Sequence, residues 1–235
     1  MVGLGPGDVA LLTPQASQAL TDADVVVGYI TYIQLIKPLL ENKVVVASGM
    51  KKETDRAKLA VDEALQGKQV VVISSGDPGV YGMAGPVLEV APPELVIDII
   101  PGVTAATSAA AALGAPLIHD FAIVSLSDLL TPWETIAKRL EAAAAADFVI
   151  VLYNPRSRGR AGHLRIAQDI ILKYRSGSTP TGYVKNIGRI GQKAVISTLA
   201  ALDNEQVDMT TTVIVGNSQT KVLHGRMVTP RGYAL

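Results

Sequence analysis

The sequence predicts an α/β protein with two α/β domains, and three observations support this prediction. In the first half, β-branched runs of strand length alternate with helical patterns, which is typical of parallel strands joined by crossover helices. In the second half, strand patterns follow one another after short connections, which indicates hairpins and a mixed sheet. Hydrophobic residues make up 49% of the 235 residues and charged residues only 18%, which favours buried sheets.

The N-terminal half contains regularly alternating elements. The expected strands are 2–4, 25–27, 44–46, 69–73 and 96–99. The expected helices are 14–20, 32–40, 53–66 and the alanine-rich segment 103–113. These elements predict a largely parallel sheet in an N-terminal domain of residues 1–115.

A C-terminal domain of residues 116–235 is expected to begin after the Gly114-Ala115-Pro116 segment. Its expected strands are 122–125, 148–152, 182–185, 194–198 and 212–215, and its expected helices are 133–145 and 164–174. The close spacing of the last three strands predicts a mixed sheet.

Composition excludes several classes of protein. The chain has no cysteine, which removes disulfides, thiol nucleophiles, iron–sulfur clusters and cysteine-ligated zinc. The three histidines are too far apart for a helical ligand pair, so we expect no metal site. A net charge of zero gives no support for a nucleic-acid partner. No apolar run approaches the roughly 18–20 residues of a membrane span, and no signal-peptide pattern is visible, so we expect a cytoplasmic protein.

The first glycine-rich loop, GLGPGD at 3–8, superficially matches a dinucleotide-binding fingerprint. Two features argue against that interpretation. Pro6 removes a backbone donor from a loop that should bind phosphate, and the strand 25–27 is followed by Gly28-Tyr29 rather than by an acidic residue. A nicotinamide oxidoreductase is therefore disfavoured. Alone, this loop is explained equally well as a tight strand-to-helix turn.

Two further loops, SSGDPGVYG at 74–82 and IPGVTAAT at 100–107, also follow strand patterns. Asp77 is expected at the carboxyl end of a strand, where open α/β sheets bind ligands, although it would also serve as a helix cap. Thr104 is either a ligand contact or a capping or buried hydroxyl. Three such loops at three strand ends favour a ligand site more than any one of them does.

These segments, taken in order, resemble the tetrapyrrole (corrin/porphyrin) methylase family. The resemblance is carried by VGLGPGD, SSGDPGVYG and PGVTAATSAAAALGAPL. HDFAIVSLSDLLTPWETIAKRL (119–140), LYNPRSRGR (152–160) and TGYVKNIGR (181–189) are similar to the precorrin-3B C17-methyltransferase branch. The resemblance covers nearly the whole chain. It implies two domains of the tetrapyrrole methylase type, S-adenosylmethionine in the cleft between them, and a homodimer.

The resemblance also implies contacts to the cofactor in five segments. These contacts are Pro6; Ser75, Gly76, Asp77 and Val80; Thr104 and Ala105; Tyr153 and Asn154; and Asn186 and Ile187. The glycine loops support the first three groups independently. The last two rest mainly on the resemblance, although Tyr153 and Asn154 also follow a buried strand pattern. Asp77 would lie near either the sulfonium or the ribose.

The implied substrate is a tetrapyrrole with many carboxylates, which calls for cations. The candidates are Arg156, Arg158, Arg160, Lys185 and Arg189. Arginine binds carboxylates through two parallel hydrogen bonds, which favours this interpretation. A solvated basic loop, or one that contacts phosphate, is the alternative.

The branch implied by the resemblance methylates C17 of precorrin-3B in cobalamin biosynthesis and contracts the macrocycle. Contraction needs a base that removes a proton from a ring hydroxyl. Asp8, His119 and Asp120 are the candidates, and a partly buried junction histidine explains His119 equally well.

Two other functions stay open. One is a sister enzyme, either the cobalt-factor III C17-methyltransferase of the anaerobic route or another precorrin methylase. The other is a catalytically inactive tetrapyrrole-binding protein, which the intact loops at 3–8, 74–82 and 101–107 argue against.

Overall fold

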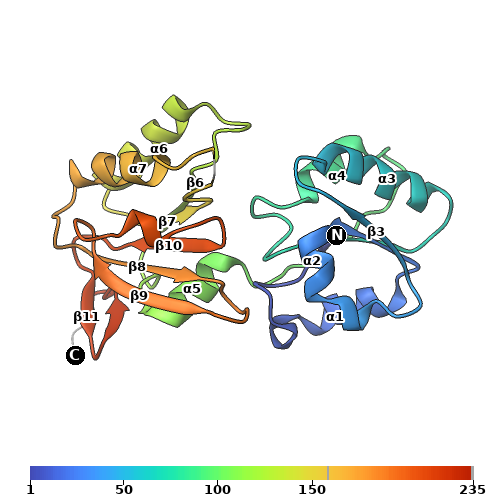
Figure 1. Cartoon of the computed structure of the whole chain (residues 1–235), viewed down its shortest axis with the longest axis horizontal. Helices are drawn as coiled ribbons and strands as arrows, with labels where there is room; N and C mark the ends of the chain where they lie inside the picture. The colour runs from blue at the N-terminus through green and yellow to red at the C-terminus, as the bar shows by residue number, and fades with distance from the viewer. Residues whose placement is uncertain (158, 234–235) are drawn as a thin grey trace. The chain divides into compact units, whose positions relative to one another are not determined.

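The computed structural model describes residues 1–157 and 159–233, and it divides into two compact units (Figure 1). The N-terminal unit is Met1–Ala105 and the C-terminal unit is Ala106–Leu235. The sequence placed the boundary ten residues later, after helix α5 (Ala105–Leu113). The helix joins the C-terminal unit because Leu113 packs over Gly182, and because the next strand, β5 (Gly114–Ala115), pairs with β12 (Arg226–Val228).

The N-terminal unit contains a four-stranded sheet whose neighbours are all parallel. The strand order is β1 (Val2–Gly3), β4 (Val70–Ser74), β2 (Val25–Tyr29) and β3 (Val44–Ser48). The prediction of a largely parallel sheet is confirmed.

Helices cover both faces of this sheet (Figure 1). Helices α1 (Pro14–Asp22) and α2 (Ile30–Leu35) share a buried cluster with Val26 of β2. Helices α3 (Glu53–Leu65) and α4 (Ala84–Val90) share another with Val25 and Val27. Successive residues of a strand point to opposite faces, so the continuous valine run is what a sheet buried on both sides requires.

Three N-terminal elements differ from the predictions. The strand expected at 96–99 does not form; only Ile100 makes a parallel bridge, to Val2, because its partner β1 is two residues long. The helix expected at 32–40 ends at Leu35 and is followed by a 3₁₀ turn, η2 (Lys37–Leu39), since proline at position 38 cannot donate to the helix. Helix α4 was missed because Gly85 and Pro86 interrupt its pattern, yet Pro86 lies in the first turn, where proline is tolerated.

The C-terminal unit contains a five-stranded mixed sheet, as predicted. Its order is β6 (Phe121–Ser125), β7 (Val149–Tyr153), β10 (Thr211–Val215), β8 (Pro180–Lys185) and β9 (Lys193–Thr198). Strands β6 and β7 are parallel, and all other neighbours are antiparallel. A small sheet of β11 (Lys221–Leu223), β12 and β5 was not predicted, because its strands have only two or three residues.

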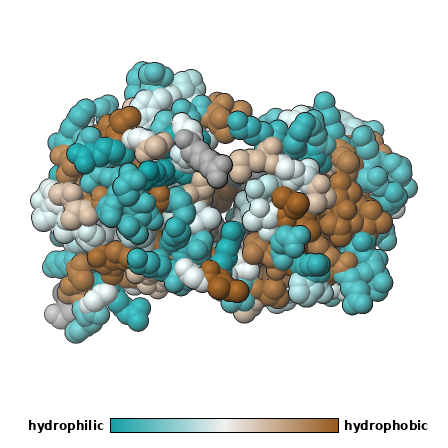
Figure 2. All heavy atoms as spheres, in the orientation of Figure 1, coloured by the Kyte–Doolittle hydropathy of each residue, from teal (hydrophilic) through white to brown (hydrophobic). Residues whose placement is uncertain are grey.

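Helices α6 (Trp133–Ala145) and α7 (His163–Leu172) pack on one face of the five-stranded sheet, against Ile150, Leu152 and Val213 (Figure 1). Short 3₁₀ turns, η1 (Val9–Leu11) and η3 (Asn204–Gln206), complete the two units. Hydrophobic residues also reach the surface among hydrophilic ones (Figure 2). None of the helices in residues 1–157 and 159–233 is long and apolar enough to cross a membrane.

Candidate active site

The three glycine loops of the N-terminal unit are joined through their main chains. Gly5 N donates to Gly76 O at 3.1 Å, and Gly76 N donates back to Gly5 O at 2.7 Å. Gly3 N donates to Ile100 O at 3.0 Å, which connects the first loop to the third. A Cβ added at Gly102 would lie 2.1 Å from Gly76 O, so the backbones approach more closely than any side chain allows.

Asp77 ties the second loop to the third with its carboxylate. Its Oδ1 accepts from Gly79 N at 2.8 Å, and its Oδ2 accepts from Gly102 N at 3.1 Å. Because α4 begins only at Ala84, Asp77 does not cap that helix. Each carboxylate oxygen has a second lone pair, so a ligand can also donate to Asp77.

The surroundings of Gly76 provide a test of whether S-adenosylmethionine fits these loops. Gly76 is buried and left-handed, with φ of 68°, and a Cβ built on it would touch Thr104 Cα at 3.6 Å and Ala105 N at 3.7 Å. The main chain at Gly76 therefore packs directly against Thr104 and Ala105, where α5 begins. A nucleoside can lie against glycine main chain and small side chains, and these loops supply both, so the residues present fit the cofactor.

The predicted residues of the N-terminal unit are thus brought together. Pro6 is buried directly after the Gly5–Gly76 bridge, and Val80 N donates to Asp77 O at 3.2 Å within the second loop. Ser75 is half-buried between β4 and Gly76. Asp8, a candidate base, has a different role from these residues. It is exposed, and its carboxylate accepts from Ala10 N at 2.9 Å and so caps η1.

In the C-terminal unit, the predicted cofactor residues share one edge of the five-stranded sheet. Strand β8 is antiparallel to β10, and β10 is antiparallel to β7, so β6, β7 and β8 all end at this side. We call it the carboxyl edge; its residues are Ser125, Tyr153, Asn154, Lys185, Asn186 and Ile187. Asn154 and Asn186 both have φ of 52°, a left-handed conformation that asparagine tolerates better than most residues.

Hydrogen bonds fix two side chains of the carboxyl edge. Asn154 Nδ2 donates to Ser125 Oγ at 3.0 Å, which joins the ends of the parallel strands β6 and β7. The Tyr153 hydroxyl accepts from Ala106 N at 2.6 Å. That amide lies in the first turn of α5, where backbone donors have no partner within the helix. Tyr153 therefore satisfies the start of α5.

Two of the arginines predicted to bind substrate already have side-chain partners in the chain. Arg156 donates to Asn204 O and to Glu205 Oε2, both at 2.7 Å. Arg160 is buried, and its guanidinium contacts Ser127, Ser157 and, at 3.8 Å, Asp128. The main-chain N of Arg189 donates to Asn186 O at 3.0 Å, and Arg158 lies outside the described residues. A substrate carboxylate would have to share the Arg156 and Arg160 guanidinium groups with these partners.

Lys185 illustrates how firmly one of these cations is held. Its ammonium lies 2.6 Å from Asp208 Oδ2, and Asp208 Oδ1 also accepts from Thr210 N at 2.8 Å. Burial opposes ionisation of Asp208, but the hydrogen bonds from Lys185, Thr210 and Thr211 outweigh it and lower the Asp208 pKa to about 2. Lys185 and Asp208 therefore stay paired as ions at neutral pH.

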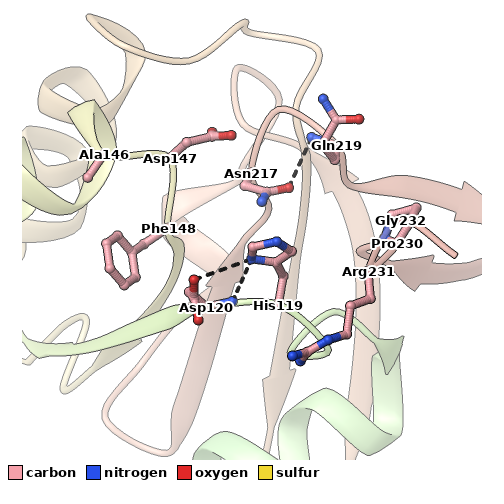
Figure 3. A pocket seen from close by; sticks show the side chains of 10 residues that line it. All are labelled: His119, Asp120, Ala146, Asp147, Phe148, Asn217, Gln219, Pro230, Arg231 and Gly232. Carbon is pink, nitrogen blue, oxygen red and sulfur yellow. Dashed lines mark hydrogen bonds and ion pairs between the residues drawn. The ribbon is translucent and has the colours of Figure 1, made fainter.

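The two remaining base candidates lie at the opposite edge of the same sheet. His119 and Asp120 directly precede β6, whereas Ser125 ends it, and each strand residue adds roughly 3.3 Å. They line a cavity of about 310 Å³ with Asp147, Asn217 and Arg231 (Figure 3). Within it, Asp120 N donates to His119 Nδ1 at 2.8 Å. The structure does not bring this pair together with Tyr153 and Asn154.

Sequence reasoning missed three polar residues near the carboxyl edge. They are Ser125 at the end of β6, Asp128 in the loop that follows it, and His163 at the start of α7. His163 Nε2 lies 3.0 Å from Asp128 Oδ2, and this hydrogen bond lowers the Asp128 pKa. The available signal was the polar residues Ser125, Ser127 and Asp128 at and directly after the end of a strand, as for Asp77. Within the described part of the chain, no group of three or more His, Cys, Asp or Glu side chains is placed to hold a metal ion.

The N-terminal unit thus has interlocked glycine loops, and the C-terminal unit has a polar sheet edge. Comparison with known proteins assigns a protein with these features to a family of enzymes. The chain belongs to the Tetrapyrrole (Corrin/Porphyrin) Methylases, whose family model matches residues 1–203. It is therefore a methyltransferase of the family that uses S-adenosylmethionine.

Individual relatives cover essentially the whole chain. The chain is 50% identical over 238 residues to the "Probable cobalt-factor III C(17)-methyltransferase" of Salmonella typhimurium, covering 100% of this chain and 99% of that one. It is 38% identical over 245 residues to the "Precorrin-3B C(17)-methyltransferase" of a Sinorhizobium species, covering 100% and 96%.

Solved structures confirm the fold. The crystal structure of the methyltransferase CobJ matches with a TM-score of 0.93 and 39% identity, covering 97% of this chain and 98% of that one. A uroporphyrin-III C-methyltransferase of Thermus thermophilus, solved in complex with S-adenosylhomocysteine, matches with a TM-score of 0.65 and 25% identity, covering 92% and 95%.

Proposed function

We propose that this protein transfers a methyl group from S-adenosylmethionine to C17 of a corrin-ring precursor in cobalamin biosynthesis, with cobalt-factor III as substrate. Membership of the tetrapyrrole methylases supports the reaction class, and the 50% identity to the Salmonella relative supports the substrate. The structural observation that carries the proposal is the interlocking of three glycine loops around buried Gly76.

The proposed cofactor residues are those predicted from the sequence. In the N-terminal unit they are Pro6, Ser75, Gly76, Asp77, Val80, Thr104 and Ala105. In the C-terminal unit they are Tyr153, Asn154, Asn186 and Ile187. When bound, S-adenosylmethionine supplies an electrophilic methyl group. The residues of the chain position the reactants and exclude water, which is the main contribution that such a displacement needs.

Precorrin-3B is the second candidate substrate, with contraction of the macrocycle after C17 methylation. The 38% identity to the Sinorhizobium enzyme and the resemblance over 119–140, 152–160 and 181–189 favour it. We propose Arg156, Arg158, Arg160, Lys185 and Arg189 as the cations that share the substrate carboxylates.

We also propose a homodimer, which light scattering on the purified protein tests directly.

Cofactor binding is the first test, by calorimetric titration with S-adenosylhomocysteine and, separately, with NADH. We expect micromolar binding of S-adenosylhomocysteine alone, and at least tenfold weaker binding by Asp77→Ala, because that variant frees Gly79 N and Gly102 N. Asp62→Ala, on the exposed surface of α3, is the matched control and should bind as the wild type does. Binding of NADH alone would contradict the proposal.

Turnover then separates the two substrates. The enzyme is incubated with S-adenosylmethionine and either cobalt-factor III or precorrin-3B, and methylated products are measured by mass spectrometry. Faster conversion of cobalt-factor III supports the first substrate, and faster conversion of precorrin-3B supports the second. Binding of S-adenosylhomocysteine without methylation of either compound would indicate another precorrin methylase or an inactive binding protein.

A further inference from the structure

Asp128 and His163 form a polar pair beside the carboxyl edge. Asp128 lies in the loop that follows β6, and His163 is the first residue of α7, which follows the loop leaving β7. Both loops start at the ends of these parallel strands, where Ser125 and Asn154 lie. The pair therefore lies on the side of the sheet that carries the proposed cofactor residues, and away from His119 and Asp120.

The imidazole of His163 is fixed by its neighbours. Its Nε2 lies 3.0 Å from Asp128 Oδ2, and its ring meets the Trp133 ring edge to face, with centroids 4.5 Å apart. The Arg160 guanidinium lies 3.8 Å from Asp128 Oδ1 and is itself bonded to Ser127. Among the described residues, Asp128 is the charged group that contacts His163, and Arg160 in turn contacts Asp128.

This arrangement fixes the chemistry available to His163. The hydrogen bond from His163 lowers the Asp128 pKa, so Asp128 is a carboxylate at neutral pH and can only accept. In neutral imidazole, Nε2 then carries the proton and Nδ1 presents a lone pair. The side chain is 18% exposed, so part of the ring is accessible to solvent. Among residues 1–157 and 159–233, no hydrogen bond to Nδ1 is present. An oriented imidazole with one acceptor available is what a general base requires.

We infer that His163, oriented by Asp128, is the base that accepts the proton released during methylation of the tetrapyrrole, an inference that rests on the proposed function. The ring carbon contributes the electron pair of the new carbon–carbon bond, and the sulfur keeps the pair of the broken sulfur–methyl bond. The ring thereby gains one positive charge. It loses that charge as a proton to His163 Nδ1, and the imidazolium passes the proton to water.

The inference is tested by comparing His163→Gln with the wild type in the turnover assay, from pH 5 to pH 9. We expect kcat to fall by about 10²- to 10⁴-fold, as when a general base is removed. The acidic limb of the wild-type pH profile should disappear in the variant, whereas binding of S-adenosylhomocysteine should change by less than about twofold. Asp128→Asn should lower kcat by only about tenfold, because His163 remains but is no longer oriented, and Asp128→Glu should restore part of that loss.

His224→Gln is the matched control, because His224 is exposed in the turn between β11 and β12 and should leave kcat and its pH profile unchanged. If His163→Gln keeps wild-type kcat, or loses activity only together with thermal stability while the acidic limb remains, His163 is structural and the inference is overturned. If the acidic limb of the pH profile disappears in His119→Gln and not in His163→Gln, the base lies at the opposite edge of the five-stranded sheet, and the inference is overturned. A wild-type enzyme inactive on both tetrapyrroles would overturn the proposed function, and this inference with it.

Discussion

The two units build their parts of the candidate site by different means. In the N-terminal unit the site is main chain: Gly3 and Gly102 approach each other and Gly76 O so closely that neither of these two glycines has room for a Cβ. In the C-terminal unit the carboxyl edge consists of side chains, among them Tyr153, Asn154 and Lys185, each with a hydrogen bond or ion pair. Adding a side-chain atom to the glycine loops should therefore lower stability and ligand binding. At the carboxyl edge, removing one polar atom should lower stability.

The largest effect is expected from Gly102→Ala. Its Cβ would lie 2.1 Å from Gly76 O and 2.8 Å from the Gly3 backbone, and neither main chain can move without separating the loops. Overpacking of this kind costs about 3 kcal/mol of unfolding free energy, and binding of S-adenosylhomocysteine should fall by at least tenfold. Urea unfolding and calorimetry measure the two effects.

Gly85→Ala is the control for the glycine comparison. Gly85 lies within α4, and a Cβ there would meet nothing within 4 Å. Alanine is the better helix former, so we expect a gain of about 0.5 kcal/mol and unchanged ligand binding. If Gly102→Ala were as harmless as Gly85→Ala, close backbone approach would not be what the glycine loops require.

A smaller effect is expected from Tyr153→Phe, which removes one oxygen and adds no atom. Ala106 is buried, so its N–H would lose its acceptor without a full replacement by water. We expect a loss of about 1–2 kcal/mol and faster hydrogen exchange at the Ala106 amide. Tyr174→Phe, on an exposed side chain, should change neither. Unaltered exchange at Ala106 would show that the Tyr153 hydroxyl does not hold the start of α5.

The smallest effect is expected from Asp208→Asn, and it depends on pH. The Asp208 pKa is lowered from 3.8 to about 2, so its stabilising contribution is complete above pH 3.8 and disappears as the pH falls through about 2. Because the Asp208 side chain is 45% exposed, we expect the variant to lose only about 0.5–1 kcal/mol at pH 7.

Urea unfolding of both proteins between pH 6 and pH 2.5 measures this difference. The two unfolding free energies should converge toward the acidic end. Asp128 and Asp147 also have lowered pKa values, so the variant should keep part of the acid sensitivity. A difference that stays constant over this range would mean that Asp208 stabilises the fold without its charge.

Much of the fold followed from local patterns. The helix predicted at 133–145 matches α6 at both ends, and the valine runs of β2, β3 and β4 form the expected parallel sheet. Strand 96–99 does not form although Val96, Ile97 and Ile99 are β-branched, because strand formation depends on the length of the partner, and β1 offers two residues. The three-residue strands β11 and β12 gave too short a pattern to detect.

For the candidate site, the sequence by itself singled out the three glycine loops, since glycine, proline and aspartate directly after strands are a local signal. It could not show that Asp77 is engaged by Gly79 and Gly102, that Arg156 and Lys185 are paired with Glu205 and Asp208, or that His119 and Asn154 lie at opposite edges of one sheet. Those facts depend on strand direction and on contacts between residues far apart in the chain. The tertiary structure decided them, because a side chain's partner and the edge it occupies are set by how distant segments pack.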